Sequence, residues 1–395
     1  MKDKLGFLEG IRGWAALIVV AHHFVLLFYP ALCSGDLIQV HVSSGNLEHF
    51  IAKSPLNILY SGNFAVCIFF VLSGFVLSYK YFKTDNASIL VEYSLKRYFR
   101  LLPPVLLSVI IGYLVLKFPC YDLNAVNAVT KSGDWLTQMN STTPSIMGAM
   151  YNAFIDSFIN GVNTYSPVLW TMNIELLGSL LLFAVLYVAH FFEQKASILC
   201  IVMIVLVFGQ LYYYSAFLAG SLLCLHYTKQ NAINNAKRWW GSILLLAGGI
   251  YFGSYPAAWK YVNESIYAPV TFKSIDLYSF YHVLGSALII LAVLKMNWAM
   301  RLLSGRIAAF LGKISFSVYL VHLFIIMCLT TNLFLYFQPS MTYKLAVIYS
   351  ILISLPVIFA TSWLIYKCVD LPAVNLSGKM VVYFKRKWKF KAVNE

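Results

Sequence analysis

Arg12 and His23 lie eleven residues apart at the two ends of an otherwise apolar stretch of sequence, RGWAALIVVAHH. An ionisable side chain inside a membrane segment is costly, so its presence there points to a function. If the stretch is helical, a rise of ~1.5 Å per residue separates the two side chains by about 16 Å. One helix would then hold a cation near one membrane face and a titratable base deep inside the membrane or toward the other face.

Glu175 and His322 are two further ionisable residues in apolar surroundings. Glu175 follows Trp170 by five residues, and a Trp at that position marks the external interface of a membrane helix. A carboxylate just inside the membrane needs a partner, and a histidine on another helix is suitable. His322 follows Lys313 by nine residues, which places it about 13 Å deeper in a helix. Purely structural roles for Glu175 and His322 remain alternatives.

Arg97 and Arg100 share a helical face just before Pro103 in the segment KRYFRLLPP. Two guanidinium groups at a membrane surface suit a phosphorylated ligand, because their geometry matches phosphate oxygens. Anchoring to lipid headgroups is the alternative. In the segment FFVLSGF, Ser73 and Gly74 allow either a thin ligand or a neighbouring helix to approach the backbone.

These residues divide by their expected depth in a helical bundle. The outer half would hold the titratable groups His23, Glu175 and His322, and the inner half would hold the cations Arg12, Arg97, Arg100 and Lys313. The sequence therefore predicts a polar path across a membrane, cationic at its inner end.

The composition supports a membrane protein along the whole chain. Sixty per cent of the 395 residues are hydrophobic and 11% are charged. Apolar runs recur throughout, which predicts an all-α, polytopic bundle of about ten membrane spans. The expected spans are 8–29, 60–81, 101–118, 167–191, 196–212, 213–228, 239–254, 277–296, 307–332 and 343–367. Residues 1–372 would form the transmembrane domain and residues 373–395 a basic cytoplasmic tail on the anionic inner leaflet.

The Lys and Arg residues that give the net charge of +14 lie mostly between the hydrophobic spans. They therefore indicate membrane topology instead of nucleic-acid binding. With both termini cytoplasmic, 23 of the 29 Lys and Arg residues lie on the inner side. Residues 209–214 leave almost no loop between the fifth and sixth spans, so a miscount there would invert the later topology. A cleaved signal peptide is the alternative for the first span, although Pro30-Ala31-Leu32 is a poor cleavage site.

The seven cysteines are distributed between spans and loops. Cys33 and Cys120 are the pair expected on the external side, where a disulfide could persist. Whether they pair depends on the approach of their backbones, which the sequence does not fix. The spacing of Cys and His residues predicts no metal site.

Six ordered motifs resemble the acyltransferase-3 family of integral membrane O-acyltransferases: LEGIRGWAALIVVAHH, AVCIFFVLSGF, KRYFRLLPP, LWTMNIE, FLGKISFSVYLVH and VDLP. The resemblance runs from about Leu8 to Pro372. It implies that Arg12 and His23 are the hallmark pair of the first span, with His22 as a bystander. The other family motifs fall on Phe69, Phe70, Ser73, Gly74, Phe75, Arg97, Arg100, Trp170, Thr171, Glu175 and His322.

Two positions depart from the family pattern. Glu9 stands where the family usually has an aspartate, which keeps the charge. Cys67 stands where an acidic residue often precedes the Phe-Phe pair. Glu175 would then have to support the catalytic histidine alone.

The resemblance implies acyl-CoA, usually acetyl-CoA, as a cytoplasmic donor substrate, and a hydroxyl of a surface glycan or its lipid-linked precursor as acceptor. We expect the CoA phosphates near Arg97 and Arg100, with Arg12 or Lys313 assisting, and the pantetheine arm passing Ser73 and Gly74. The remaining expected roles are His23 as general base, Glu175 stabilising its imidazolium, and His322 positioning the acceptor or the oxyanion. A covalent acyl-histidine is an alternative.

The favoured hypothesis is therefore an enzyme that lies in the inner (plasma) membrane and contacts its lipids. The rival functions are a secondary transporter or channel, since charged residues also line ion paths, and a glycan- or lipid-binding subunit of an envelope assembly. Neither paired broken helices nor corresponding halves are visible in the sequence.

Overall fold

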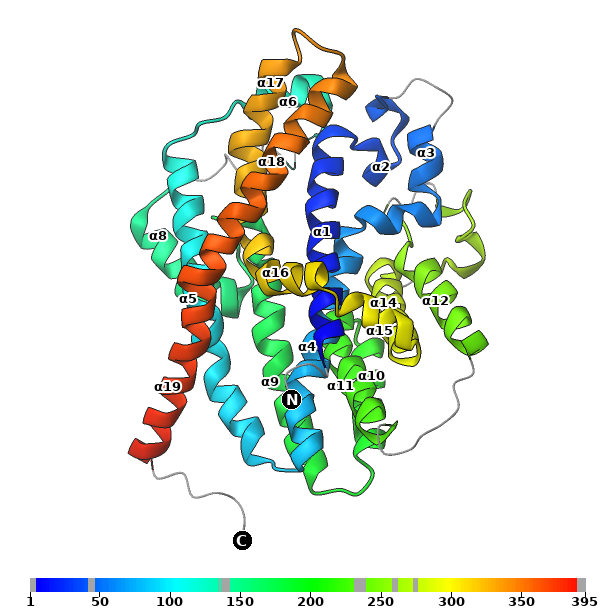
Figure 1. The fold of residues 1–395 in the computed structure, drawn as a ribbon, viewed down its shortest axis with the longest axis vertical. Helices are drawn as coiled ribbons and strands as arrows, with labels where there is room; N and C mark the ends of the chain where they lie inside the picture. The colour runs from blue at the N-terminus through cyan, green and yellow to red at the C-terminus, as the bar shows by residue number, and fades with distance from the viewer. Residues whose placement is uncertain are drawn as a thin grey trace.

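A computed structural model of the chain describes residues 5–41, 47–133, 135, 143–230, 239–257, 262–272 and 276–388. All regular secondary structure in these residues is helical, which confirms the predicted all-α class (Figure 1). Most of the long helices lie along the long axis of the molecule, and short helices join them at one end. The buried apolar side chains of the long helices form one large core.

Among the described residues, seven helical segments are long and apolar enough to cross a membrane: Gly6–Phe28, Gly62–Thr84, Ser88–Lys117, Pro167–His190, Leu277–Lys295, Arg306–Phe337 and Tyr343–Met380. They contain helices α1 (Gly6–Phe28), α4 (Gly62–Thr84), α5 (Ser88–Lys117), α9 (Trp170–His190), α14 (Leu277–Lys295), α16 (Arg306–Ile325), α17 (Thr331–Phe337) and α18 (Tyr343–Ile365). Each of the seven overlaps one of the ten predicted spans.

The other three predicted spans are also helical but do not meet the same criterion. They correspond to α10 (Lys195–Phe208), α11 (Tyr212–Gln230) and α12 (Trp239–Gly253). A short turn with Gln210 at φ 58° separates α10 from α11, so the two are distinct helices. Ten spans and two cytoplasmic termini therefore stay predictions.

Helix α5 begins at Ser88, well before the start predicted at residue 101. The segment KRYFRLLPP, whose arginines we expected at the membrane surface just before this span, is therefore part of a continuous helix. Pro103 and Pro104 lie inside it. Proline is tolerated in a membrane helix where its neighbours satisfy the freed backbone carbonyl groups. Because the helix continues, Arg97 and Arg100 are held on a rigid element.

The C-terminal segment is also helical. Helix α18 passes through a π-helical turn, η8 (Tyr366–Asp370), into α19 (Leu371–Trp388), which packs along α5 (Figure 1). The expected domain boundary at residue 372 falls inside this helix. Residues 389–395 of the expected tail lie outside the described residues, and its place on the inner leaflet stays a prediction.

Short helices lie in the described parts of the three longest segments between the predicted spans, 30–59, 119–166 and 255–276. They are α2 (Ala31–Ser34), η1 (Leu37–Gln39), α3 (Leu47–Ala52), η2 (Pro55–Tyr60), α6 (Leu123–Thr130), α8 (Ile146–Tyr151), the π-helix η4 (Asn152–Asn160) and η6 (Ala268–Val270). The remaining elements are η5 (Pro167–Leu169), α15 (Asn297–Leu303) and the π-helix η7 (Ile326–Thr330). Helices α2, α3 and α6 lie toward the end of the molecule opposite the end of α19 (Figure 1).

Close helix crossings set the distances within the bundle. At the crossing of α1 and α16, a Cβ added to Gly312 would lie 2.2 Å from the carbonyl oxygen of Glu9. At the crossing of α4 and α11, a Cβ on Gly74 would lie 2.0 Å from the carbonyl oxygen of Phe217. Both distances are shorter than any allowed contact, so the approach of the helices requires glycine. Gly74 thus serves helix packing, one of the two roles considered for it.

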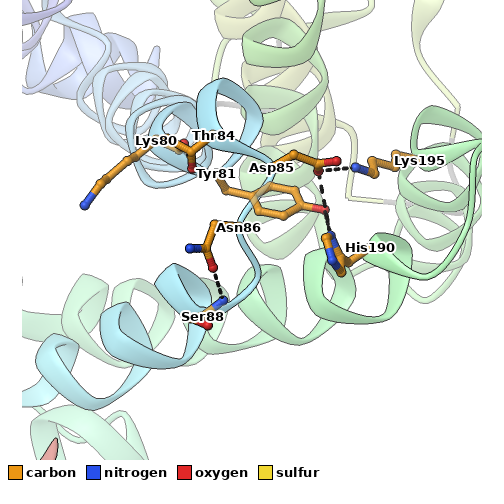
Figure 2. Close-up of polar contacts among 8 residues, drawn as sticks. All are labelled: Lys80, Tyr81, Thr84, Asp85, Asn86, Ser88, His190 and Lys195. Atoms are coloured by element: carbon orange, nitrogen blue, oxygen red, sulfur yellow. Dashed lines mark hydrogen bonds and ion pairs between the residues drawn. The ribbon is translucent and has the colours of Figure 1, made fainter. Parts of the chain in front are cut away.

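A polar cluster joins α4 to α9 and α10 near the end of the molecule that carries the C-terminus (Figure 2). Asp85, at the end of α4, forms ion pairs with Lys195 and with His190 Nδ1, the latter at 3.7 Å. The Tyr81 hydroxyl lies 3.4 Å from the same His190 nitrogen. In contrast, the Lys80 side chain points away from this cluster and is exposed.

Cys33 and Cys120 are free cysteines, so the structure does not contain the bridge considered for them. Cys33 lies in α2, with its Sγ 4.0 Å from His22 Nδ1, and burial raises the pKa of its thiol to about 12. The Cys120 side chain instead hydrogen bonds to Cys328. The two thiols therefore face different elements of the external region.

Candidate active site

A cavity of about 90 Å³ lies between α1, α4, α5, α9 and α16 and contains most of the predicted inner-half residues. We call it the arginine cavity. Its polar lining consists of Arg12, Ser73, Arg97, Arg100, Thr171, Glu175, Ser315 and Tyr319. The fold therefore brings together three of the four cations that the sequence placed in the inner half of the bundle.

Glu175 lies in the arginine cavity and forms an ion pair with Arg97. Its Oε1 atom also accepts a hydrogen bond from Ser73 Oγ at 2.7 Å, and Arg97 Nε donates to Ser179 Oγ at 3.1 Å. The Arg97 and Glu175 side chains are each 14% exposed. The carboxylate that we expected beside His23 is thus engaged by a guanidinium on α5 and a hydroxyl on α4.

Arg100 pairs with Asp370, whose Oδ1 lies 2.7 Å from Arg100 Nη2. The Phe316 ring centroid lies 5.9 Å from the Arg100 guanidinium carbon. Asp370 is buried and ends the π-helix η8, a type of helix that is frequent at functional sites. Asp370 belongs to the VDLP motif, for which we expected no role in the site. An acidic residue inside a late apolar segment was the signal that could have found it.

Arg12 has the loosest ion pair of the three cavity arginines. Its Nη1 atom lies 3.8 Å from Glu9 Oε1, and the two side chains are 35% and 45% exposed. Arg12 is therefore the most available cation for an anionic ligand. Lys313, the fourth predicted cation, is exposed on α16 and does not line the arginine cavity.

A second cavity of about 300 Å³ lies next to the first, and we call it the histidine cavity. Val66 and Tyr319 line both cavities. The Tyr319 hydroxyl donates to the Val168 carbonyl oxygen at 2.7 Å and lies 3.0 Å from Thr171 Oγ1. Val66 and Tyr319 therefore mark the boundary between a cationic chamber and an uncharged one.

His23 lines the histidine cavity, and His322 lies directly behind it. His322 Nε2 is 3.1 Å from His23 Nδ1. In each ring Nδ1 is 2.9 Å from a backbone carbonyl oxygen four residues earlier, that of Val19 for His23 and of Val318 for His322. A carbonyl oxygen accepts hydrogen bonds, so both Nδ1 atoms carry the proton. His322 Nε2 then has a lone pair, and the single His23 Nδ1–H is shared between this lone pair and the Val19 carbonyl oxygen.

This hydrogen-bond pattern fixes the chemistry available to His23. Because Nδ1 carries the proton, His23 Nε2 holds the basic lone pair. A neutral imidazole oriented by a second group is a typical general base. His23 Nδ1 contacts the Val19 carbonyl oxygen and His322 on α16, whereas Glu175 pairs with Arg97. Sequence spacing indicated both histidines but did not show that they contact one another.

A family model described as an acyltransferase domain matches residues 5–367. The chain is 24% identical over 407 residues to "Acyltransferase R4" of Phoma sp., covering 84% of this chain and 85% of that protein. It is 24% identical over 408 residues to "Acyltransferase clz18" of Cochliobolus lunatus, with 84% and 85% covered. It is 26% identical over 258 residues to "O-acetyltransferase PaAT-1" of Phomopsis amygdali, with 57% and 49% covered. No solved structure has significant similarity to the chain.

Proposed function

The chain belongs to the acyltransferase-3 family of membrane acyltransferases, and from this premise we propose that it transfers an acyl group from cytoplasmic acyl-CoA to a hydroxyl group. The donor is acetyl-CoA, and the acceptor is a surface glycan or its lipid-linked precursor. One observation carries the proposal. The arginine cavity and the histidine cavity share Val66 and Tyr319 in their linings, so a cationic chamber lies directly beside a chamber that holds a histidine base.

The donor binds on the arginine side. CoA carries phosphate groups, and guanidinium groups recognise phosphate through paired hydrogen bonds. Arg12 supplies the most available guanidinium, while Arg97 and Arg100 are held in place by Glu175 and Asp370. A cavity of about 90 Å³ is small, so it takes the thin pantetheine arm and leaves the nucleotide at its mouth. Ser73, which lines this cavity, is beside the path of the arm.

The transfer occurs at His23. The acceptor O–H gives its proton to His23 Nε2, and the oxygen attacks the thioester carbonyl carbon to form a tetrahedral intermediate. The C–S bond then breaks, and the CoA sulfur leaves with the proton from the imidazolium. His322 Nε2 stabilises this imidazolium by accepting the hydrogen bond from His23 Nδ1. Direct transfer is favoured over an acyl-histidine because the hydrogen-bonded pair is arranged for proton transfer.

A coupled assay tests this function. The purified protein is incubated with acetyl-CoA and a thiol reagent, and free CoA is measured with and without candidate glycans. The proposal predicts glycan-dependent CoA release that His23→Ala abolishes while the variant still folds and still binds acetyl-CoA. A transporter or a glycan-binding subunit would release no CoA under any of these conditions. Near-normal turnover by His23→Ala would remove His23 from the mechanism.

A further inference from the structure

The walls of the histidine cavity carry no net charge. Among the described residues that line it, none is Asp, Glu, Lys or Arg. The polar groups are the imidazoles of His22 and His23, the amide of Asn63 and the phenol groups of Tyr278 and Tyr319, and the remainder is apolar or aromatic. The adjoining arginine cavity, by contrast, has three guanidinium groups and a carboxylate.

A small pocket of about 40 Å³ extends this neutral chamber toward the external segments. His22 and Tyr278 line both spaces, and the pocket is closed by Cys33, Asn57, Tyr60 and Tyr255. We call it the tyrosine pocket. Its described lining also lacks Asp, Glu, Lys and Arg. The neutral environment thus continues from His23 to side chains of α2 and η2.

Hydrogen bonds to uncharged groups orient Asn63, one of the polar residues of this chamber. Asn63 Nδ2 lies 2.9 Å from His282 Nδ1, and His282 Nε2 lies 3.0 Å from the Tyr255 carbonyl oxygen. His282 therefore has its proton on Nε2 and accepts from the Asn63 amide at Nδ1. The Tyr213 hydroxyl in turn donates to Asn63 Oδ1 at 2.7 Å. The network fixes Asn63 without any ionised partner.

His22 adds a hydrogen-bond acceptor to the same chamber. Its Nδ1 atom lies 3.0 Å from the Tyr60 carbonyl oxygen, so Nδ1 carries the proton and Nε2 keeps a lone pair. The ring has room because residue 62 is glycine, where an added Cβ would lie 2.7 Å from the imidazole carbons. His22, which we expected to be a bystander, thus lines both the histidine cavity and the tyrosine pocket.

We propose that the histidine cavity and the tyrosine pocket form the acceptor subsite and select an uncharged hydroxylated ring. This inference rests on the proposed function. A volume of about 300 Å³ is at the lower end for small-molecule sites, whose walls are mostly apolar with a few polar groups. The ring lies between Trp170 and Tyr278, presents one hydroxyl to His23 and donates a second to His22 Nε2. A carboxylate or phosphate on this ring would be buried without a cation, which is costly.

Matched acceptors test the charge selection. The full-length protein, in a detergent without a sugar headgroup, is given acetyl-CoA and pairs of methyl glycosides that differ by one group, such as a glucoside and its glucuronide. We expect kcat/KM at least about 100-fold higher for the neutral member, because an unpaired buried charge is strongly disfavoured. Equal or faster acylation of the charged member overturns the proposal. The proposal is also overturned if the protein binds acetyl-CoA but acylates none of the neutral rings. If the protein does not bind acetyl-CoA, the result counts against the proposed function itself.

Variants of His22 test the site independently. His22→Phe should raise the acceptor KM about 10-fold or more through loss of the Nε2 acceptor, and leave the acetyl-CoA KM unchanged. His22→Gln should recover part of the acceptor KM, because its Oε1 atom can replace Nε2 as acceptor. A merely structural role would alter both KM values or lower the melting temperature of both variants. That result would remove His22 from the acceptor subsite.

Discussion

His322 Nε2 lies 3.1 Å from His23 Nδ1, which makes a histidine on α16 the direct neighbour of the base on α1. The contact depends on the close crossing of these two helices at Gly312. Since His322 Nδ1 faces the Val318 carbonyl oxygen, the ring accepts at Nε2 and holds His23 in the tautomer that leaves Nε2 basic. We therefore expect the two residues to act as one unit in the proposed reaction.

The first prediction concerns His322. Replacing it with Ala removes one of the two acceptors of His23 Nδ1–H and leaves the Val19 carbonyl oxygen, so the imidazolium is less stabilised and we expect kcat to fall about 100-fold, in the range typical of acid–base catalysis. The acetyl-CoA KM should not change, because His322 does not line the arginine cavity. The double variant His23→Ala/His322→Ala should be no slower than His23→Ala, since residues that act as one unit are non-additive. Additive losses in the CoA-release assay would contradict the pairing.

The second prediction concerns the ion pair between Arg97 and Glu175. Glu175→Leu leaves a buried guanidinium without its partner, and breaking a buried pair in this way costs about 3–5 kcal/mol. The melting temperature of the purified protein should therefore fall. The double variant Arg97→Leu/Glu175→Leu should be more stable than Glu175→Leu, because it leaves no unpaired charge. If the double variant is instead the less stable of the two, Glu175 does not serve mainly as the partner of Arg97.

The distribution of apolar residues was sufficient to predict the helical class and the approximate ends of the helices. Seven of the segments are long and apolar enough to span a membrane. The continuity of α5 through Pro103 and Pro104 was not predictable in the same way. A proline pair normally indicates the end of a helix, and here the surrounding bundle overrides that local preference.

The sequence predicted which residues belong to the candidate site, but not which of them pair with one another. His23, Arg97 and Arg100 each line one of two adjoining cavities, but Glu175, which the depth argument placed in the outer half with His23, lies in the arginine cavity with the cations. The depth of a residue does not specify the rotation of its helix, so the sequence did not show that Glu175 faces Arg97. The salt bridge from Arg100 to Asp370 was missed because 270 positions of chain separate the two residues, and no local pattern connects them.

The third prediction separates helix packing from ligand contact at Ser73 and Gly74. An added methyl group at Gly74 would meet the Phe217 backbone, so Gly74→Ala should destabilise the protein by about 1–3 kcal/mol, as overpacking does. The folded fraction of the Gly74→Ala variant should have the same acetyl-CoA KM as the unmodified protein. Ser73→Ala should instead raise that KM, because Ser73 lines the arginine cavity and holds Glu175. Melting curves and donor titrations on both variants decide between these roles.

The last prediction concerns Arg12 as the main phosphate ligand of the donor. A hydrogen bond to a charged group contributes about 1.5–3 kcal/mol, so Arg12→Ala should raise the acetyl-CoA KM about 10-fold or more. Arg12→Lys should recover part of the loss, because it keeps the charge but not the fork of donors. The matched control is Lys80→Ala, which removes an exposed cation that points away from its polar neighbours (Figure 2). Its acetyl-CoA KM should equal that of the unmodified protein. If Arg12→Ala and Lys80→Ala change the acetyl-CoA KM by the same factor, Arg12 acts only through the general surface charge.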